Sequence, residues 1–175
     1  MKPPAAGPPA YQGRSIAVYA EEVALPNGRR VVLDVVRHPG ASAVVPFVSP
    51  QDVLLIRQFR HAAGGTILEV PAGKLDGEAP EVCAARELEE EAGQHAGRLE
   101  HLASIWTTPG FTDEEIHLFA AFDLTPVPTR HEEDEVIEVV RMPLTEALER
   151  VWCGELRDAK SALALLHAAH RIGRL

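Results

Sequence analysis

Apolar and polar residues alternate in two stretches of the chain, at positions 16–70 and 102–142, and this pattern predicts two groups of β-strands. In the first stretch, Asn27-Gly28 separates two apolar runs. This dipeptide favours the tight turn of a hairpin because both residues tolerate a positive φ. The apolar runs predict strands at 16–25, 31–36, 43–48, 53–58, 66–70, 102–107, 116–122 and 136–142.

Three other segments predict helices. The first spans 79–93, where Pro80 suits the first turn and Gly93 can end the helix in the left-handed conformation. The others span 145–152 and 158–172. The order of strands, one helix, strands and then two helices favours an α+β fold with mixed α/β/α layers over a regular series of βαβ units.

Composition and charge narrow the class of protein. The 175 residues suffice for one domain with one sizeable core. The net charge of −9 argues against binding to nucleic acid or to an anionic membrane. No apolar run approaches the roughly 20 residues that cross a bilayer, and the N-terminus lacks a signal-peptide core. Because two cysteines cannot build a disulfide framework, we expect a cytoplasmic protein.

A few further residues have predicted environments. Proline and glycine among alanines predict that residues 1–13 form a disordered tail. Cys83 is expected to be a small buried residue of the first helix, and Trp106 and Trp152 are expected to be core aromatics.

The first predicted helix carries an unusual concentration of acids. Glu87, Glu90 and Glu91 stand at i, i+3 and i+4, so they share one helix face. Carboxylates about 6 Å apart repel by about 3 kcal/mol per pair at an effective dielectric constant of about 20. An ordinary solvated helix face is one explanation, because glutamate is a good helix former. A divalent cation such as Mg²⁺ is the other, because it takes oxygen ligands and turns the repulsion into attraction.

The segment 73–93 resembles the signature box of the Nudix hydrolases, G-x5-E-x7-R-E-U-x-E-E-x-G-U, where U is a bulky apolar residue. The spacing from Glu78 to Gly93 matches at every specified position. Two departures exist, because only four residues separate Gly73 from Glu78 and the last position is Gln94. The resemblance implies the Nudix fold, an α/β/α sandwich with a mixed β-sheet. It also implies hydrolysis of a nucleoside diphosphate linked to another group, with Mg²⁺ or Mn²⁺ as the cofactor.

The resemblance also implies roles for individual residues of the box. Arg86 would orient the carboxylates, Glu78 would anchor the preceding loop, and Glu90 would act as a ligand or a base. The metal ligands would be Ala72 (through its carbonyl), Glu87, Glu90 and Glu91.

A second sequence segment resembles one subfamily of the Nudix hydrolases. The segment 108–114, with Pro109 placed 15 residues after Gln94, resembles the element that marks ADP-ribose pyrophosphatases. This likeness implies that Arg60, with Arg57 as a weaker candidate, contacts the substrate phosphate. The residues that would lie against the ribose or adenosine part are Gly110, Phe111 and Glu114.

An acidic run at 132–135 is either a solvated loop or the source of the catalytic base. In similar ADP-ribose pyrophosphatases, a glutamate of this loop activates the attacking water. The matching positions here are Glu133 and Glu135, with Glu133 narrowly favoured.

The predicted function is metal-dependent hydrolysis of ADP-ribose to AMP and ribose 5-phosphate. By the same resemblance, an N-terminal antiparallel β-region at 14–40 would form a homodimer, and residues 41–175 would form the hydrolase domain. One alternative is the same chemistry on another nucleoside diphosphate sugar, a dinucleotide cofactor or coenzyme A. The other is a non-catalytic nucleotide sensor, which predicts a damaged box.

Overall fold

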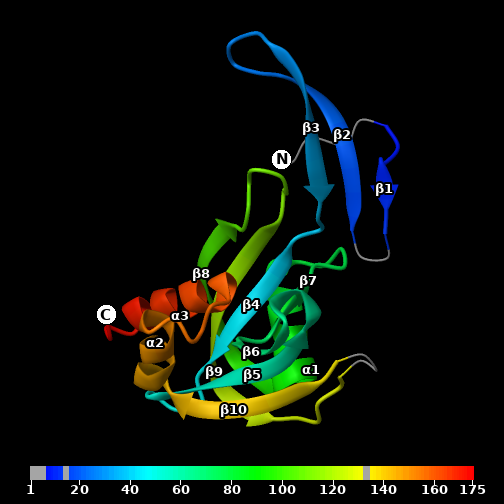
Figure 1. The fold of residues 1–175 in the computed structure, drawn as a ribbon. Helices are drawn as coiled ribbons and strands as arrows, with labels where there is room; N and C mark the ends of the chain where they lie inside the picture. The colour runs from blue at the N-terminus through cyan, green and yellow to red at the C-terminus, as the bar shows by residue number, and fades with distance from the viewer. Residues whose placement is uncertain (1–6, 14–15, 132–134) are drawn as a thin grey trace.

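Two β-sheets, with helix α1 on one side and α2 and α3 on the other, make up the body of the molecule (Figure 1). The structure is a computed structural model that describes residues 7–13, 16–131 and 135–175. The elements are β1 Tyr11–Gln12, β2 Ala17–Ala24, β3 Arg30–Arg37, β4 Ala41–Pro46, β5 Asp52–Arg60, the 3₁₀ helix η1 His61–Ala63, β6 Gly65–Glu69, β7 Ala72–Lys74, α1 Pro80–Ala92, β8 Gln94–Trp106, β9 Glu115–Pro126, β10 Ile137–Pro143, α2 Leu144–Trp152 and α3 Ala159–Arg171.

The two sheets of the body differ in the direction of their strands. One has the order β7-β4-β9-β8, with β4 and β9 parallel and the other pairs antiparallel. The other has the order β10-β5-β6 and is antiparallel throughout. The mixed sheet between helices confirms the predicted fold class.

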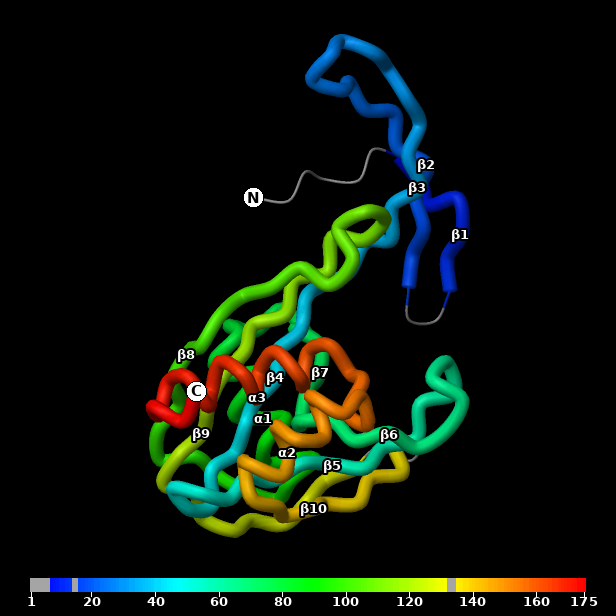
Figure 2. Tube along the Cα trace, turned by 60° about the vertical axis from the view of Figure 1, so that its left-hand side comes forward, coloured from blue at the N-terminus to red at the C-terminus, as the bar shows by residue number. Residues whose placement is uncertain are grey.

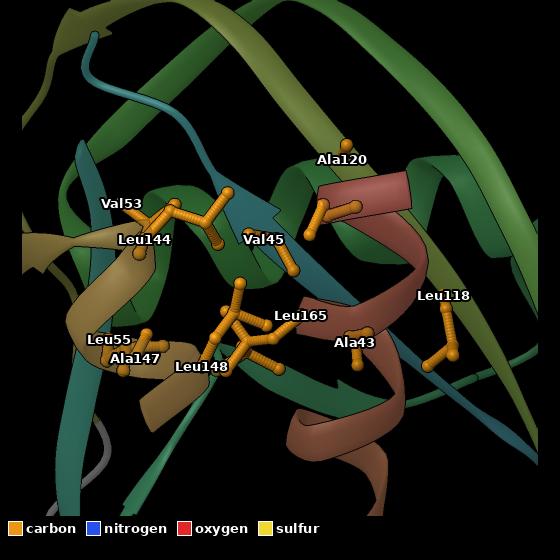
Figure 3. Close-up of a cluster of buried hydrophobic side chains, with 14 of the residues drawn as sticks. Ala43, Val45, Val53, Leu55, Leu118, Ala120, Leu144, Ala147, Leu148 and Leu165 are labelled. Carbon is orange, nitrogen blue, oxygen red and sulfur yellow. The ribbon is translucent and has the colours of Figure 1, made fainter. Parts of the chain in front are cut away.

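Strand β4 carries the two apolar cores of the body, one on each face. Val45 points to the larger core, which β4, β5, β9, α2 and α3 build together, and side chains from all five converge there (Figure 3). Val44 points to the smaller core, beneath Ala84 and Leu88 of α1. Each fully buried valine or leucine stabilises the fold by about 1.5–3 kcal/mol. Because neighbouring strand residues face opposite sides, an uninterrupted apolar strand can bind helices on both.

Helix α1 begins and ends where its sequence predicts. Pro80 occupies its first turn and Glu81 lies near its positive end. Gly93 closes the helix at φ +62°, and its N–H donates to the carbonyl of Glu89. The bounds matter for function, because they fix the direction in which the acidic face points.

Strands β2 and β3, with β1 alongside β2, form an arm that projects from the body (Figures 1 and 2). At its base, the N–H of Val36 donates to the carbonyl of Phe111 over 2.7 Å. Arg37 pairs with Glu21 within the arm and with Asp113 of the body. Further out, Val32 and Leu33 are exposed to 65% and 45%. The arm is therefore fastened to the body by polar contacts and leaves apolar residues uncovered.

The structure corrects several predicted details. Strand β8 starts at Gln94, eight residues before the predicted start, and β7 was not predicted because it lies in the glycine-containing loop. Tyr11–Gln12 pair with β2, so the segment expected to be a disordered tail contains a short strand. Trp106 and Trp152 are 70% and 62% exposed, so their assignment to the core was wrong, whereas the burial of Cys83 is confirmed.

Within the described ranges, none of the helices has the length and apolar character needed to span a membrane.

Candidate active site

A cleft of about 730 Å³ opens between the two sheets, beside the acidic face of α1. Six residues predicted or considered for the site line it: Arg60, Ala72, Glu87, Glu91, Glu114 and Glu135. They come from β5, β7, α1 and the segments before β9 and β10, so the fold collects them from separate elements between residues 60 and 135.

Two carboxylates of α1 are buried in this cleft. Glu87 is 8% exposed and Glu91 is 2% exposed. Burial raises the pKa of Glu91 to about 8, and the charges of Glu87 and Glu135 add to the rise, while an N–H···O bond from Ala72 over 2.8 Å opposes it. Burial also raises the pKa of Glu87, against the opposing effect of Arg86. Such carboxylates bear negative charge at a high free-energy cost unless a cation joins them.

Gly73 makes room for one of these carboxylates. A Cβ atom built on Gly73 would lie 1.8 Å from Oε1 of Glu87, well inside contact distance. Strand β7 holds this backbone in place by pairing Gly73 with Ser42 of β4. The glycine of the box is thus required by the close approach of a side chain.

Arg86 forms ion pairs with three acidic residues of the box. Its guanidinium lies 2.8 Å from Glu78, 2.7 Å from Glu87 and 2.8 Å from Glu90. A further bond to the carbonyl of Lys74 joins the loop to the helix. Burial acts to lower the pKa of Arg86, but these carboxylates outweigh it and raise the pKa. The contacts are those expected of a residue that orients the carboxylates and of a Glu78 that anchors the loop.

Glu90 differs from the other two helix glutamates. It turns to Arg86 and lies outside the lining that the described residues give the cleft. In the described part of the chain, no three acidic, histidine or cysteine side chains converge into one metal-ligand set. Arg86 pairs with both Glu87 and Glu90, so a cation of the protein already offsets part of their charge.

The described residues on either side of 132–134 lie beside α1 and the cleft. The N–H of Arg130 donates to the carbonyl of Glu90 over 3.0 Å, and Nε2 of His131 lies 3.1 Å from the carbonyl of Glu91. Glu135 lines the cleft, and its charge raises the pKa of both Glu87 and Glu91. Glu133, the other predicted base, lies outside the described residues.

Arg60 stands on the wall of the cleft in a network that the sequence did not reveal. It makes a two-pronged bond to Glu69, at 2.9 and 3.0 Å, and Nζ of Lys160 lies 2.6 Å from the same carboxylate. Burial acts to raise the pKa of Glu69, which is 1% exposed, but Arg60 and Lys160 outweigh it and lower the pKa. One buried acid therefore holds two cations at the cleft.

Lys160 was missed although the sequence contains a signal for it. It lies in the first turn of α3, two residues after the capping residue Asp158. A cation is unfavourable at the positive end of a helix. Such a lysine is an indication of an interaction outside its own helix, which here is Glu69.

Of the remaining residues predicted to contact the substrate, one lines the cleft and the others lie outside its lining. Glu114 lines the cleft, with one carboxylate oxygen 2.7 Å from Oγ1 of Thr107. Arg57 faces away from the cleft into a second cavity of about 680 Å³ and lies 3.3 Å from Glu138. Gly110 and Phe111 lie in the turn between β8 and β9 near the arm, outside the lining described, and Phe111 is 54% exposed.

The donor set of the cleft suits a hard divalent cation. Its anionic groups are carboxylates. Glu87 and Glu91 are both buried, and such a cation relieves the repulsion between their charges. Oxygen ligands without thiolates are typical of magnesium or manganese sites. The residues present therefore fit the cofactor that the box implies.

Comparisons with known proteins agree with this geometry. A model of the NUDIX domain matches residues 36–163. The ADP-ribose pyrophosphatase of Bacillus subtilis (strain 168) is 42% identical over 158 residues, which cover 89% of this chain and 85% of that protein. The GDP-mannose pyrophosphatase of Cronobacter sakazakii is 40% identical over 149 residues, 79% of this chain and 76% of that protein. A structure titled "Crystal structure of ADP compounds hydrolase" superposes with a TM-score of 0.83 at 26% identity, covering 95% of this chain and 93% of that one.

Proposed function

This chain belongs to the NUDIX family, and from that premise we propose that it hydrolyses the pyrophosphate bond of ADP-ribose to give AMP and ribose 5-phosphate. The observation that carries the proposal is the pair of buried carboxylates, Glu87 and Glu91, beside Gly73 in a cleft that also contains Arg60. The substrate follows from the names of the Bacillus subtilis relative and of the matched structure.

The cofactor would be held by the buried side of α1. Glu87 and Glu91, with the carbonyl of Ala72, would bind a divalent cation, Mg²⁺ or Mn²⁺. When bound, such an ion neutralises diphosphate charge and lowers the pKa of a bound water. Arg86 fixes the direction of Glu87 through their ion pair.

The other residues would bind the substrate and move the proton. Arg60, held by Glu69, would donate to phosphate oxygens, for which a guanidinium fork is suited. A glutamate of the acidic loop, Glu135 or Glu133, would accept a proton from the attacking water. Glu135 has support from its place in the cleft near Glu87 and Glu91.

Another nucleoside diphosphate sugar is the second candidate substrate, and the similarity to a GDP-mannose pyrophosphatase favours it. A dinucleotide cofactor or coenzyme A would require the same machinery. A sensor without catalysis is disfavoured, because Glu87, Glu90 and Glu91 are all present.

A substrate panel in Mg²⁺ or Mn²⁺, run in ¹⁸O-labelled water with products weighed by mass spectrometry, tests the proposal. We expect kcat/KM to be highest for ADP-ribose, with one ¹⁸O atom in a phosphate product. Glu91→Gln should lower kcat/KM by about 100-fold or more, because a neutral amide binds Mg²⁺ poorly. Glu89→Gln is the matched control, since Glu89 is on the same helix and pairs with His95 and Arg130.

Two results would count against the proposal. Turnover by Glu91→Gln within tenfold of the wild type would contradict the metal assignment. Calorimetric binding of ADP-ribose in Mg²⁺ with no AMP released would instead indicate a sensor.

We further propose that the β-region at 14–40 joins two copies of the chain and that residues 41–175 carry the catalysis. The exposed Val32 and Leu33 of the arm support this, as does Ile16, which lies at the edge of the cleft. Location in the cytoplasm stays a prediction from the cysteine content.

A further inference from the structure

Gln58, in the wall of the cleft, has a buried side-chain oxygen without a hydrogen bond. It lies on β5 two residues before Arg60, and both residues line the cleft. The side chain belongs to a residue only 5% exposed, and among the described residues its Oε1 atom has no hydrogen-bond partner and no contact with solvent. Native proteins keep few such groups, and most of them have a function.

The surrounding strands prevent Gln58 from relieving this cost by itself. Strand β5 is the middle strand of its sheet, and Gln58 pairs with Ile137 of β10 on one side and Ile67 of β6 on the other. Its backbone is therefore fixed, and the side chain is confined to the cleft face. A buried amide oxygen without a hydrogen bond costs free energy, and a ligand in the cleft can return that free energy by supplying the missing bond.

The chemistry of the amide identifies the part of a ligand that it fits. Charged phosphate oxygens are already matched by Arg60 and Lys160 on the same wall. A neutral amide offers one acceptor and one donor group, which together suit a hydroxyl, because a hydroxyl also donates and accepts. Residues i and i+2 of a strand lie about 6.6 Å apart, so the group bound by Gln58 lies near the phosphate bound by Arg60 without being part of it.

We propose that Gln58 binds a ribosyl hydroxyl of the nucleoside diphosphate substrate and so contributes to the choice of substrate. This inference rests on the proposed function. The hydroxyl belongs either to the ribose at the far end of the diphosphate or to the ribose of adenosine, and the test separates the two.

Gln58→Met, which keeps the length of the side chain and removes the amide, is compared with the wild type on three substrates. These are ADP-ribose, the β-methyl ester of ADP, which lacks the terminal ribose, and ADP-ribose made with 2′,3′-dideoxyadenosine. We expect kcat/KM for ADP-ribose to fall by about 10- to 100-fold, mainly through KM, because a bond to a buried polar group is lost. The loss should disappear on one of the two analogues, which identifies the ribose concerned.

Gln51→Met is the matched control, because Gln51 is exposed in the turn before β5. The ligand-free Gln58→Met protein should melt no lower than the wild type, since the Oε1 atom that is removed has no hydrogen-bond partner among the described residues. An equal loss of kcat/KM on all three substrates would overturn the proposal, as would a change in the Mg²⁺ concentration that gives half the maximal rate.

The proposed function can fail separately. If the wild type releases no AMP from ADP-ribose, calorimetric binding of the same three compounds replaces kinetics. Weaker binding of ADP-ribose by Gln58→Met, with one analogue unaffected, then still supports the role of Gln58, and unchanged binding of all three contradicts it.

Discussion

Glu87 can lie against the β7 backbone only because residue 73 lacks a side chain. The Cβ position at Gly73 falls 1.8 Å from a carboxylate oxygen, and the nearest atoms all belong to the end of one flexible side chain. A larger residue would therefore displace the carboxylate rather than the backbone. Such a substitution would therefore weaken metal binding and would change the free energy of unfolding much less.

Gly73→Ala tests whether a side chain at this position affects metal binding more than folding stability. We expect kcat/KM to fall by about 100-fold and Mg²⁺ affinity measured by calorimetry to weaken, while the free energy of unfolding changes by less than about 1 kcal/mol. A variant with unchanged Mg²⁺ affinity would show that Glu87 does not bind the metal in this position.

The buried Glu91 predicts a pH dependence that reverses when metal is added. Its pKa is raised to about 8 in the folded protein, so between the ordinary glutamate pKa of about 4.5 and pH 8 the folded state holds a proton that the unfolded state has released. Stability of the metal-free protein therefore falls as pH rises through this range. Melting temperatures measured in EDTA should decline from pH 5 to pH 8, and Glu91→Gln should flatten the decline.

With Mg²⁺ present, affinity should instead rise with pH over the same range, because the ion competes with the proton for Glu91. Isothermal titration in two buffers of different ionisation enthalpy would measure the protons released. Release of none at pH 7 would contradict the assignment of Glu91.

The sequence predicted the residues of the box and, through the resemblance to a subfamily, also Arg60, Glu114 and Glu135, but not the other residues that line the cleft. Glu87, Glu91 and Arg86 follow from spacing within one helix, and spacing is visible in the chain. Gln58, Lys160 and His38 line the same cleft only because separate strands and helices bring them there. No local pattern marks such residues, apart from the cation at the start of α3.

At the scale of elements, β5 shows how one strand serves two sides of the body. Gln58 and Arg60 face the cleft, whereas Arg57, one position from Gln58, faces the cavity beside α2 and α3. The resemblance favoured Arg60 over Arg57 as the residue that contacts phosphate. The alternation of the strand supports this preference, because it places only Arg60 of the two in the lining of the cleft.

This separation of the two arginines predicts unequal variants. Arg60→Lys should lower kcat/KM by about 10- to 100-fold, because lysine loses the two-pronged geometry, while Arg57→Lys should stay within about threefold of the wild type. Melting temperatures of both variants control for the ion pair between Arg60 and Glu69. Equal losses in the two variants would show that Arg57 also reaches the substrate.

Only the second half of strand β8 was predicted. Its first half, 94–101, contains polar and charged residues and includes Gly97, and it shows no clear alternation of burial. The half is held by backbone pairing to β9, by Arg98 stacked over Phe122 at 4.1 Å, and by Ala96 and Leu99, which pack against the smaller core. Two partly buried apolar residues among polar ones leave little trace in hydrophobic periodicity.

At the scale of the whole molecule, the arm and the body differ in how they are held. Neither of the two apolar cores includes a residue of β1, β2 or β3 in the regions that the structure describes. Val32 and Leu33 of the arm are exposed, as are several apolar residues of the body, and uncovered apolar surface is typical of protein–protein contacts. The arm therefore supports the proposed homodimer.

A double variant, Val32→Lys with Leu33→Lys, should convert the dimer to a monomer, because it places charges in the apolar contact. Sedimentation velocity would measure the change in mass, and kcat/KM should fall if the arm completes the site. Val82→Lys is the control, since Val82 is 55% exposed but lies on α1. A monomeric wild type would contradict the proposed dimer.

The polar fastening of the arm has an evolutionary consequence. Because β2 and β3 contribute nothing to either core, substitutions along them are selected by whatever the arm touches and hardly at all by the stability of the body. A lineage of this fold can thus change its quaternary structure while the chemistry at α1 is inherited unaltered.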